Sequence, residues 1–318
     1  MMQSFNRWLE THSRILMEGA VVERLKRSGA GVHPELLNSA CLCESKGRTA
    51  MSAIYEEYIR IAHDHHLPLI LLTPTWRAEA HRIRTTLKMD ADELFEDAVQ
   101  FMHERVTNAG LSSETTRLGG LIAIRGDVVK PAEWLSEEDA FQFHRQTTKA
   151  LADAGVDFLL PSTLPALPEA VGLARACADT GSPYGISVSI TSEGRLYDRS
   201  PLEDLLRTLV DLSAPPAFIN VNCVHPEVFI DGYRRTMDRA PDTEGLVQGL
   251  QANTSRLSAE ELDQAENLIQ DETPETYADW LMKAFREFRL KMVGGCCGSD
   301  GQHIEALAKR LVSTDPRP

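Results

Sequence analysis

Two adjacent cysteines, Cys296 and Cys297, follow an apolar run and have glycines on both sides. A disulfide between chain neighbours is strained, because normal disulfide geometry needs well-separated Cα atoms with converging Cβ vectors. Glycine tolerates positive φ, so the flanking residues let the backbone turn sharply until both sulfurs point toward one centre. The pair therefore indicates a shared metal ion, which would need a third soft ligand.

Cys223 is the candidate for this third ligand. It directly follows an apolar segment at 217–222 that is typical of a buried strand, and the cysteine pair follows a second such segment at 290–293. In a (β/α)₈ barrel the carboxyl ends of all strands open onto one face, where active sites are built. The three thiols would meet there, although they lie far apart in the sequence.

Three thiolates with one open position are typical of catalytic zinc, because structural zinc sites are normally closed by four protein ligands. Thiolates are soft ligands and favour Zn²⁺ over Mg²⁺ or Ca²⁺. A substrate thiol that binds in the open position would lose its proton at neutral pH and become a nucleophile. The alternative is that each cysteine is a small buried side chain, the usual role of a free cysteine. Three of them at one barrel face favour the metal site.

The other cysteines and two nearby histidines are given ordinary roles. Cys177 lies on an Ala/Leu face of a predicted helix, and Cys41 and Cys43 are spaced too closely for the usual zinc-binding pattern. His225 and His303 follow the metal-binding segments and could be ligands or hydrogen-bond partners of ligands. We expect both histidines to be exposed to solvent.

The elements that position these residues alternate between strands and helices. Apolar runs predict strands at 13–17, 67–73, 118–124, 156–161, 184–190, 217–222, 246–250 and 290–293. Helical spacing predicts helices at 21–28, 51–65, 75–87, 91–108, 136–154, 166–179, 202–212 and 303–311. This alternation predicts an α/β protein with one (β/α)₈ TIM barrel as a single domain over residues 1–318, with a helical extension at 1–14. The irregular stretches 29–49 and 251–274 are interpreted as insertions.

Composition and charge restrict the partners. The formal net charge of −14 argues against nucleic acid, because the surplus of Lys and Arg that neutralises phosphates is missing. No apolar run is long enough to span a membrane, and the first residues do not resemble a signal peptide. We therefore expect a cytoplasmic protein with no nucleic-acid or membrane partner. A homo-oligomer is compatible with the sequence, which does not decide the oligomeric state.

Two cysteine motifs also carry a family resemblance. The segments Val-Asn-Cys at 221–223 and Gly-Gly-Cys-Cys-Gly at 294–298 resemble the signature of the homocysteine S-methyltransferase family. Members of that family are zinc-dependent (β/α)₈ barrels that move a methyl group to the sulfur of homocysteine. Similarity runs from about residue 15 to residue 311. The resemblance implies that Cys223, Cys296 and Cys297 bind zinc, with Asn222 lining the pocket.

The chain departs from the family pattern where the amino acid would bind. Residues 18–20 read Glu-Gly-Ala where the family has Asp-Gly-Gly or Asp-Gly-Ala, so a carboxylate is kept but is one methylene longer. Residues 161–163 read Pro-Ser-Thr where the family has Phe-Glu-Thr, and that glutamate would hold the ammonium group of homocysteine. Either Glu18 or another carboxylate takes this role, or the acceptor is a different thiol. The substrate contacts predicted on this basis are Glu18, Gly19, Ser162, Thr163 and Asn222.

The predicted function is zinc-dependent S-methyl transfer between small molecules. The acceptor is homocysteine or a related thiol, and the donor is a sulfonium or ammonium compound or a methylated carrier. Two alternatives remain open at this point. The chain could be a zinc- and thiol-binding relative without catalytic activity, or the methyltransferase subunit of a multi-protein, cobalamin-dependent system.

Overall fold

A computed structural model of the chain describes residues 4–126, 128–257, 261 and 272–313. Eight parallel strands form its centre, and each lies where an apolar run predicts one. Their bounds are β1 Ile15–Met17, β2 Leu69–Leu72, β3 Thr116–Ile122, β4 Phe158–Pro161, β5 Gly185–Val188, β6 Phe218–Val224, β7 Val247–Ala252 and β8 Met292–Gly295.

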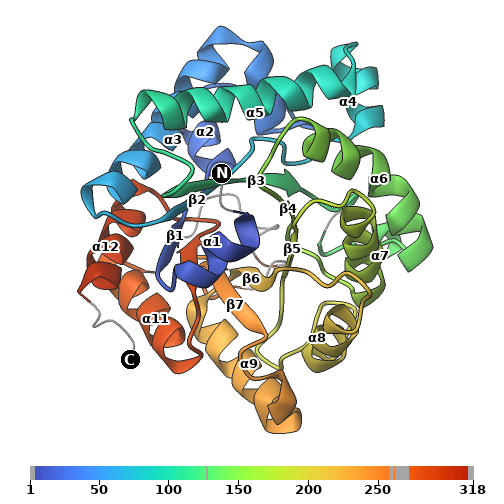
Figure 1. Cartoon of the computed structure of the whole chain (residues 1–318), viewed down its shortest axis with the longest axis vertical. Helices are drawn as coiled ribbons and strands as arrows, with labels where there is room; N and C mark the ends of the chain where they lie inside the picture. Colours follow the sequence, from blue (N-terminus) through green and yellow to red (C-terminus); the bar gives the residue numbers. More distant parts are fainter. Residues whose placement is uncertain (1–3, 127, 258–260, 262–271, 314–318) are drawn as a thin grey trace.

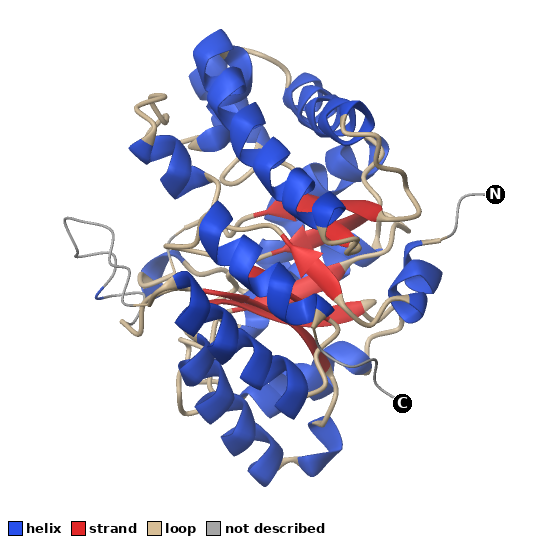
Figure 2. Cartoon of the chain, turned by 90° about the vertical axis from the view of Figure 1, so that its left-hand side faces the viewer, coloured by secondary structure: helices blue, strands red, loops and turns tan. Residues whose placement is uncertain are grey.

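The strands close into a barrel. The order in the sheet is β4-β3-β2-β1-β8-β7-β6-β5, and every recorded strand pair is parallel. The two ends of this order are joined by two isolated parallel bridges, from Leu159 of β4 to Tyr184 just before β5 and from Leu164 just after β4 to Val188 of β5. Figure 1 shows the strands as a central ring with helices around it, and Figure 2 shows the same layers from the side. The (β/α)₈ barrel prediction is confirmed.

The helices that cover the barrel are α1 Phe5–Thr11, α2 Val22–Arg27, α3 Ser45–Asp64, α4 Ala80–Leu87, α5 Ala91–Asn108, α6 Glu137–Asp153, α7 Leu167–Ala178, α8 Leu202–Val210, α9 Pro226–Arg239, α11 Pro274–Glu287 and α12 Gly301–Val312. Three short 3₁₀ helices join them: η1 Asn38–Cys43, η2 Pro131–Glu133 and η3 Pro241–Thr243. Within the residues described, none of these helices combines the length and the apolar character needed to cross a bilayer.

Several helix bounds differ from the prediction. Helix α3 begins at Ser45, inside the stretch interpreted as an insertion, and α9 and α11 were not predicted. Helix α4 begins at Ala80 rather than at residue 75, because Thr75 forms a turn with Thr73 and Glu79 caps the helix through the N–H groups of residues 81 and 82. Much of the predicted insertion at 251–274 lies outside the described residues.

Helix α1 closes the amino end of the barrel, as Figure 1 shows in the view along the barrel. The ring of Phe5 stacks on Phe158 in the barrel interior, with centroids 4.3 Å apart. Trp8 is fully buried, and its indole N–H donates to the carbonyl of Glu114 at 2.8 Å. The guanidinium of Arg117 lies 5.6 Å from the centroid of the Trp8 ring. This packed end leaves the opposite end of the strands as the place for chemistry.

Candidate metal centre

Three thiols meet at the carboxyl end of the barrel. Cys223 Sγ lies 3.1 Å from Cys296 Sγ and 3.5 Å from Cys297 Sγ. All three sulfurs lie within 4.8 Å of one another, and each residue is half-buried. The structure thus brings together the cysteines of β6 and of the turn after β8, the three residues that the sequence predicts as metal ligands.

The turn after β8 directs its two cysteines toward this centre. Gly298 has a φ of +84°, a left-handed conformation that glycine adopts without strain, and a Cβ there would collide with Thr254. The N–H of Cys296 donates to the carbonyl of Ala252 at 2.7 Å, and the N–H of Thr254 donates to the carbonyl of Cys297 at 3.1 Å. These bonds fix the cysteine pair against the end of β7.

Cys223 reaches the centre through an irregularity in β6. Successive strand residues face opposite sides, and Val221 packs in the helix layer, so a regular strand would turn Cys223 that way too. The pairing with β7 shifts between Asn222 and Val224, and Cys223 has a φ of +59°. This left-handed backbone costs about 1–2 kcal/mol for a residue with a side chain. The bulge turns the thiol toward the barrel mouth instead.

The three thiols share their protons unequally. Hydrogen bonds from Cys223 and Cys297 lower the pKa of Cys296 well below its usual range. The pKa of Cys223 is raised, chiefly because its thiol bonds to Cys296 and then to Cys297. Three thiols in contact are a donor set that suits a soft metal ion, because a divalent cation can replace their protons and stabilise all three thiolates. These residues could therefore hold a metal.

Glu18 and Gly19 lie beside this centre at the end of β1. The Glu18 carboxylate is buried, and its Oε2 accepts the N–H of Leu72 at 2.8 Å. Burial raises the pKa of Glu18 to about 8, and the bond from Leu72 acts in the opposite direction. A Cβ on Gly295 would approach Gly19 Cα to 3.1 Å, so Gly19 packs directly against the end of β8, just before the cysteine pair.

Ser162, Thr163 and Asn222 are buried at the same end of the barrel. Asn222 Oδ1 accepts the N–H of Thr163 at 3.0 Å, and Asn222 Nδ2 donates to Thr163 Oγ1 at 2.7 Å. The hydroxyl of Ser162 donates to the carbonyl of Leu160 at 3.4 Å. The structure thus places these residues at the predicted face, and their contact with substrate stays a prediction.

Glu23 is a member of the site that we did not single out from the sequence. Its Oε2 accepts the N–H of Gly298 at 2.6 Å, and its carboxyl also bonds to Cys297. Burial, followed by the charge of Cys297, raises the pKa of Glu23 to about 7. The sequence could have indicated Glu23 as a site residue, because it is an acidic residue in the first turn of α2, the helix after β1, and such positions lie at the barrel mouth.

The expectation that His225 and His303 are exposed was wrong, since both are buried. His225 caps α9 by accepting the N–H of Glu227 at Nδ1 (3.1 Å), and its ring packs edge-on against Trp280. His303 lies in the first turn of α12, with Nδ1 2.8 Å from Asp300 Oδ1. Capping and packing draw both rings into the protein, and neither joins the thiol cluster.

The remaining cysteines lie apart from the thiol cluster. Cys177 is buried in the core on α7, as predicted from its Ala/Leu face. Cys41 is buried and Cys43 is exposed, both in η1. Within the described residues, only Cys223, Cys296 and Cys297 form a group that could hold a metal.

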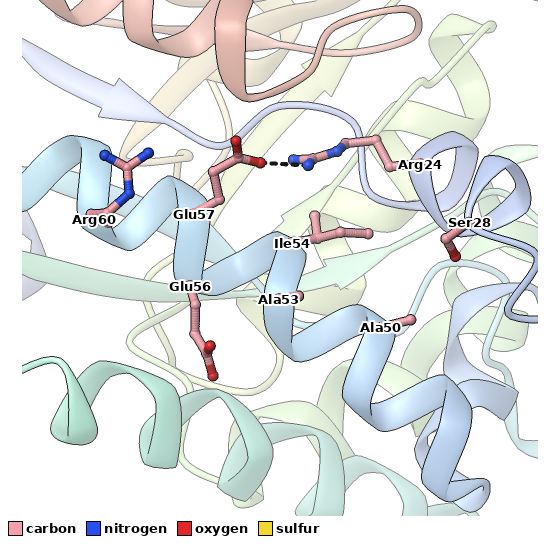
Figure 3. A pocket seen from close by; sticks show the side chains of 8 residues that line it. All are labelled: Arg24, Ser28, Ala50, Ala53, Ile54, Glu56, Glu57 and Arg60. Atoms are coloured by element: carbon pink, nitrogen blue, oxygen red, sulfur yellow. Dashed lines mark hydrogen bonds and ion pairs between the residues drawn. The ribbon is translucent and has the colours of Figure 1, made fainter.

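A pocket between α2 and α3 is separate from this centre. Figure 3 shows Arg24 of α2 and Glu57 of α3, two of the residues that line it, joined by an ion pair. None of the residues that line it is a predicted site residue. The chemistry suggested by the sequence therefore lies at the barrel mouth and not in this pocket.

Comparisons with known proteins agree with this description. A family model described as homocysteine S-methyltransferase matches residues 15–311. Homocysteine S-methyltransferase YbgG of Bacillus subtilis is 23% identical over 323 residues, covering 94% of this chain and 95% of that protein. Betaine–homocysteine S-methyltransferase 1 of Bos taurus is 21% identical over 254 residues, covering 74% of this chain and 62% of that protein.

A solved structure gives the same fold. The metallated form of the homocysteine methyltransferase MmuM from Escherichia coli superimposes with a TM-score of 0.74 at 20% identity, covering 95% of this chain and 98% of that one. The family match extends over both segments that supply the thiols. The chain therefore belongs to the homocysteine S-methyltransferase family.

Proposed function

We propose that the chain is a zinc-dependent S-methyltransferase in which Cys223, Cys296 and Cys297 hold one Zn²⁺. The observation that supports this most strongly is the meeting of three thiols from β6 and the turn after β8 at the carboxyl end of the barrel. When bound, Zn²⁺ supplies an open coordination position and a positive charge that lowers the pKa of an acceptor thiol.

The protein's own part in the reaction is to position the reactants and to exclude water. An apolar cluster inside the barrel includes side chains of α1 and closes the amino end, so both substrates would enter by the mouth. In-line placement of the acceptor sulfur and the donor methyl group converts the encounter into an effectively unimolecular step. An electron pair of the sulfur forms the new S–C bond while the bond from methyl to donor breaks. The donor keeps the electron pair of the bond that breaks, and the thiol proton goes to solvent.

The acceptor in this proposal is homocysteine or a closely related amino-acid thiol. Ser162 stands where a family glutamate would pair with the ammonium group, so that partner is absent from the end of β4. Glu18 is the carboxylate that suits the role, because it is buried and no basic side chain of the described chain contributes to its pKa. An ammonium group would compensate its charge. Gly19, Ser162, Thr163 and Asn222 complete the proposed substrate contacts.

The donor in this proposal is a small sulfonium or quaternary ammonium compound. Betaine appears in the name of a relative, and betaine carries a quaternary ammonium whose methyl group can be transferred. Loss of methyl neutralises the onium centre, so the leaving group departs without separating charge. A methylated carrier remains the other donor class.

The test of the metal site is zinc content in single cysteine variants. Wild-type protein should hold about one Zn²⁺ per chain, and Cys296→Ser and Cys297→Ser should lose it, since two remaining thiolates bind zinc far more weakly. Cys43→Ser is the matched control, because Cys43 is exposed and is not a member of the thiol cluster. Wild-type zinc content in both site variants would overturn the proposal.

The test of activity is mass detection of methylated product from purified protein with several thiols and several onium donors. Turnover with any pair contradicts the alternative of a thiol-binding relative without catalysis. Turnover by the single chain also contradicts a requirement for a separate cobalamin protein. Absence of product with every pair, despite bound zinc, would refute the proposed activity while leaving the metal site intact.

A further inference from the structure

Asn222 immediately precedes Cys223 at the bulge in β6, and most of the hydrogen-bonding capacity of its side chain is used inside the protein. Its Oδ1 accepts the N–H of Thr163 at 3.0 Å and the hydroxyl of Ser187 at 2.7 Å. Its Nδ2 donates to Thr163 Oγ1 at 2.7 Å. An amide offers two donors and two acceptor positions, so three of the four are used by the protein itself.

Two residues beside Asn222, its chain neighbour Cys223 and its hydrogen-bond partner Thr163, have unusual backbones. Cys223 has a φ of +59°, and so does Thr163, although a β-branched residue rarely adopts positive φ. Such conformations persist only where the surroundings over-determine them. Asn222 precedes Cys223 in the chain, and its side-chain amide makes two hydrogen bonds to Thr163. A single side chain therefore links the irregular ends of β4 and β6.

Further bonds anchor this amide in the barrel. Ser187 on β5 also accepts a hydrogen bond from Asn220 Nδ2 at 3.0 Å, and the same nitrogen lies 3.4 Å from Gln251 Oε1 on β7. Ser187 and Asn220 are fully buried. The network thus spans four neighbouring strands, β4 to β7. Removing one member of a buried network leaves its partners without hydrogen bonds.

We propose that Thr163 and Asn222 are positioning residues, which hold Cys223 in its left-handed conformation so that its thiol can reach Cys296 and Cys297. The argument rests on the proposed zinc site. A regular β6 would send the Cys223 side chain toward the helix layer, as it does for Val221. Thr163 and Asn222 therefore set the affinity for the metal, although neither contacts it.

The test compares variants that differ by one hydroxyl group. Thr163→Val keeps the shape and the branched Cβ but leaves Asn222 Nδ2 without its acceptor, and Thr163→Ser restores the hydroxyl. Ser162→Ala is the matched control for metal affinity, because this neighbouring buried hydroxyl bonds to Leu160 and not to Asn222. The dissociation constant for Zn²⁺ is measured by competition with a chromophoric chelator. The thiolate-to-metal absorption of the Co²⁺-substituted protein reports how many sulfurs bind.

Thr163→Val should weaken Zn²⁺ binding about tenfold, the usual scale for residues that orient ligands, and reduce the thiolate absorption. Thr163→Ser and Ser162→Ala should bind Zn²⁺ as the wild type does. Ser187→Ala, which removes the other side-chain donor to Asn222, should also weaken binding, and it replaces Thr163→Val if that variant does not fold.

Three outcomes separate the ideas. Wild-type affinity and absorption in both Thr163→Val and Ser187→Ala would overturn the positioning role. A raised KM for the thiol acceptor with unchanged Zn²⁺ affinity would also overturn it and leave Thr163 only its proposed contact with substrate. Wild-type protein that takes up no Zn²⁺ would instead refute the proposed function on which the inference rests.

Discussion

Replacing Glu18 with glutamine should stabilise the ligand-free protein at neutral pH. Burial raises the pKa of this carboxyl from 4.5 to about 8, so the folded state holds the proton more tightly than the unfolded state does. The stability contributed by the protonated carboxyl is therefore fully present below pH 4.5 and is lost as the pH rises through 8. Glutamine stays neutral at every pH and can still accept the N–H of Leu72.

The magnitude follows from the pH interval. Between pH 4.5 and pH 7 the folded state loses about 1.4 kcal/mol of stability per pH unit at this one site. Glu18→Gln should therefore raise the free energy of unfolding by about 3 kcal/mol at pH 7 and leave it nearly unchanged at pH 4.5. The same change should raise the KM for an amino-acid thiol, because the proposed partner of the ammonium group is gone.

The assay is urea unfolding of the wild type and of Glu18→Gln across this pH range, without substrates. Glu10→Gln, an exposed change on α1, is the control and should follow the wild type at each pH. A stability difference between Glu18→Gln and wild type that does not grow as the pH rises would refute the reasoning. A growing difference without any change in KM would support the buried-charge argument and remove Glu18 from the substrate contacts.

Three further perturbations test other parts of the structure. Trp8→Ala should lower the free energy of unfolding by about 3–5 kcal/mol, because a fully buried indole closes the amino end; urea unfolding measures this, and zinc per folded chain should not change. Gly298→Ala should destabilise the turn by about 1–2 kcal/mol and weaken zinc binding, because φ of Gly298 is +84° and Thr254 occupies the space of a Cβ. A wild-type dissociation constant for Zn²⁺ in chelator competition would contradict this. Removing Zn²⁺ with a chelator should lower the midpoint of thermal unfolding, because Zn²⁺ at a hundred times its dissociation constant stabilises the folded state by about 2.7 kcal/mol. Equal midpoints with and without Zn²⁺ would argue against binding to the folded state.

The sequence predicted the barrel and the meeting of the thiols for the same physical reason. Each strand reads as a short apolar run because it is covered on both faces, and parallel strands in a barrel end on one side. Cys223 directly follows such a run, and the cysteine pair follows another after two glycines. The order of the strands along the chain was therefore enough to predict that the three thiols meet.

Helices that carry mixed charge were harder to predict. Helix α9 was missed because Arg234, Arg235 and Asp238 lie among its apolar residues, although Phe229 and Tyr233 form a buried face. The periodicity that marks such a face is short and interrupted, so tertiary packing decides the outcome. Helix α11 is different, because its buried residues Tyr277, Leu281 and Phe285 recur every four positions, so the sequence does contain the periodicity of this helix.

The local conformation of the site could not be read from residue types. Nothing in the sequence marks Cys223 as left-handed. In our proposal that backbone depends on the hydrogen bonds between its neighbour Asn222 and Thr163, which follows β4. The burial of His225 likewise depends on Trp280, a residue of α11. Contacts between distant segments decide both features, and a single sequence does not encode them as a pattern.

Strand β8, which precedes the cysteine pair, pairs with β7 on one side and with β1 on the other. Ile15 of β1 lies opposite Met292 of β8, so this pairing joins segments from nearly opposite ends of the described chain. Contacts of such large sequence separation form slowly during folding. The thiols lie on β6 and after β8, which β7 joins, so zinc uptake by refolding protein reports the pairing of β6, β7 and β8 and does not require β1. The interval between zinc uptake and the recovery of full stability then measures the time of barrel closure.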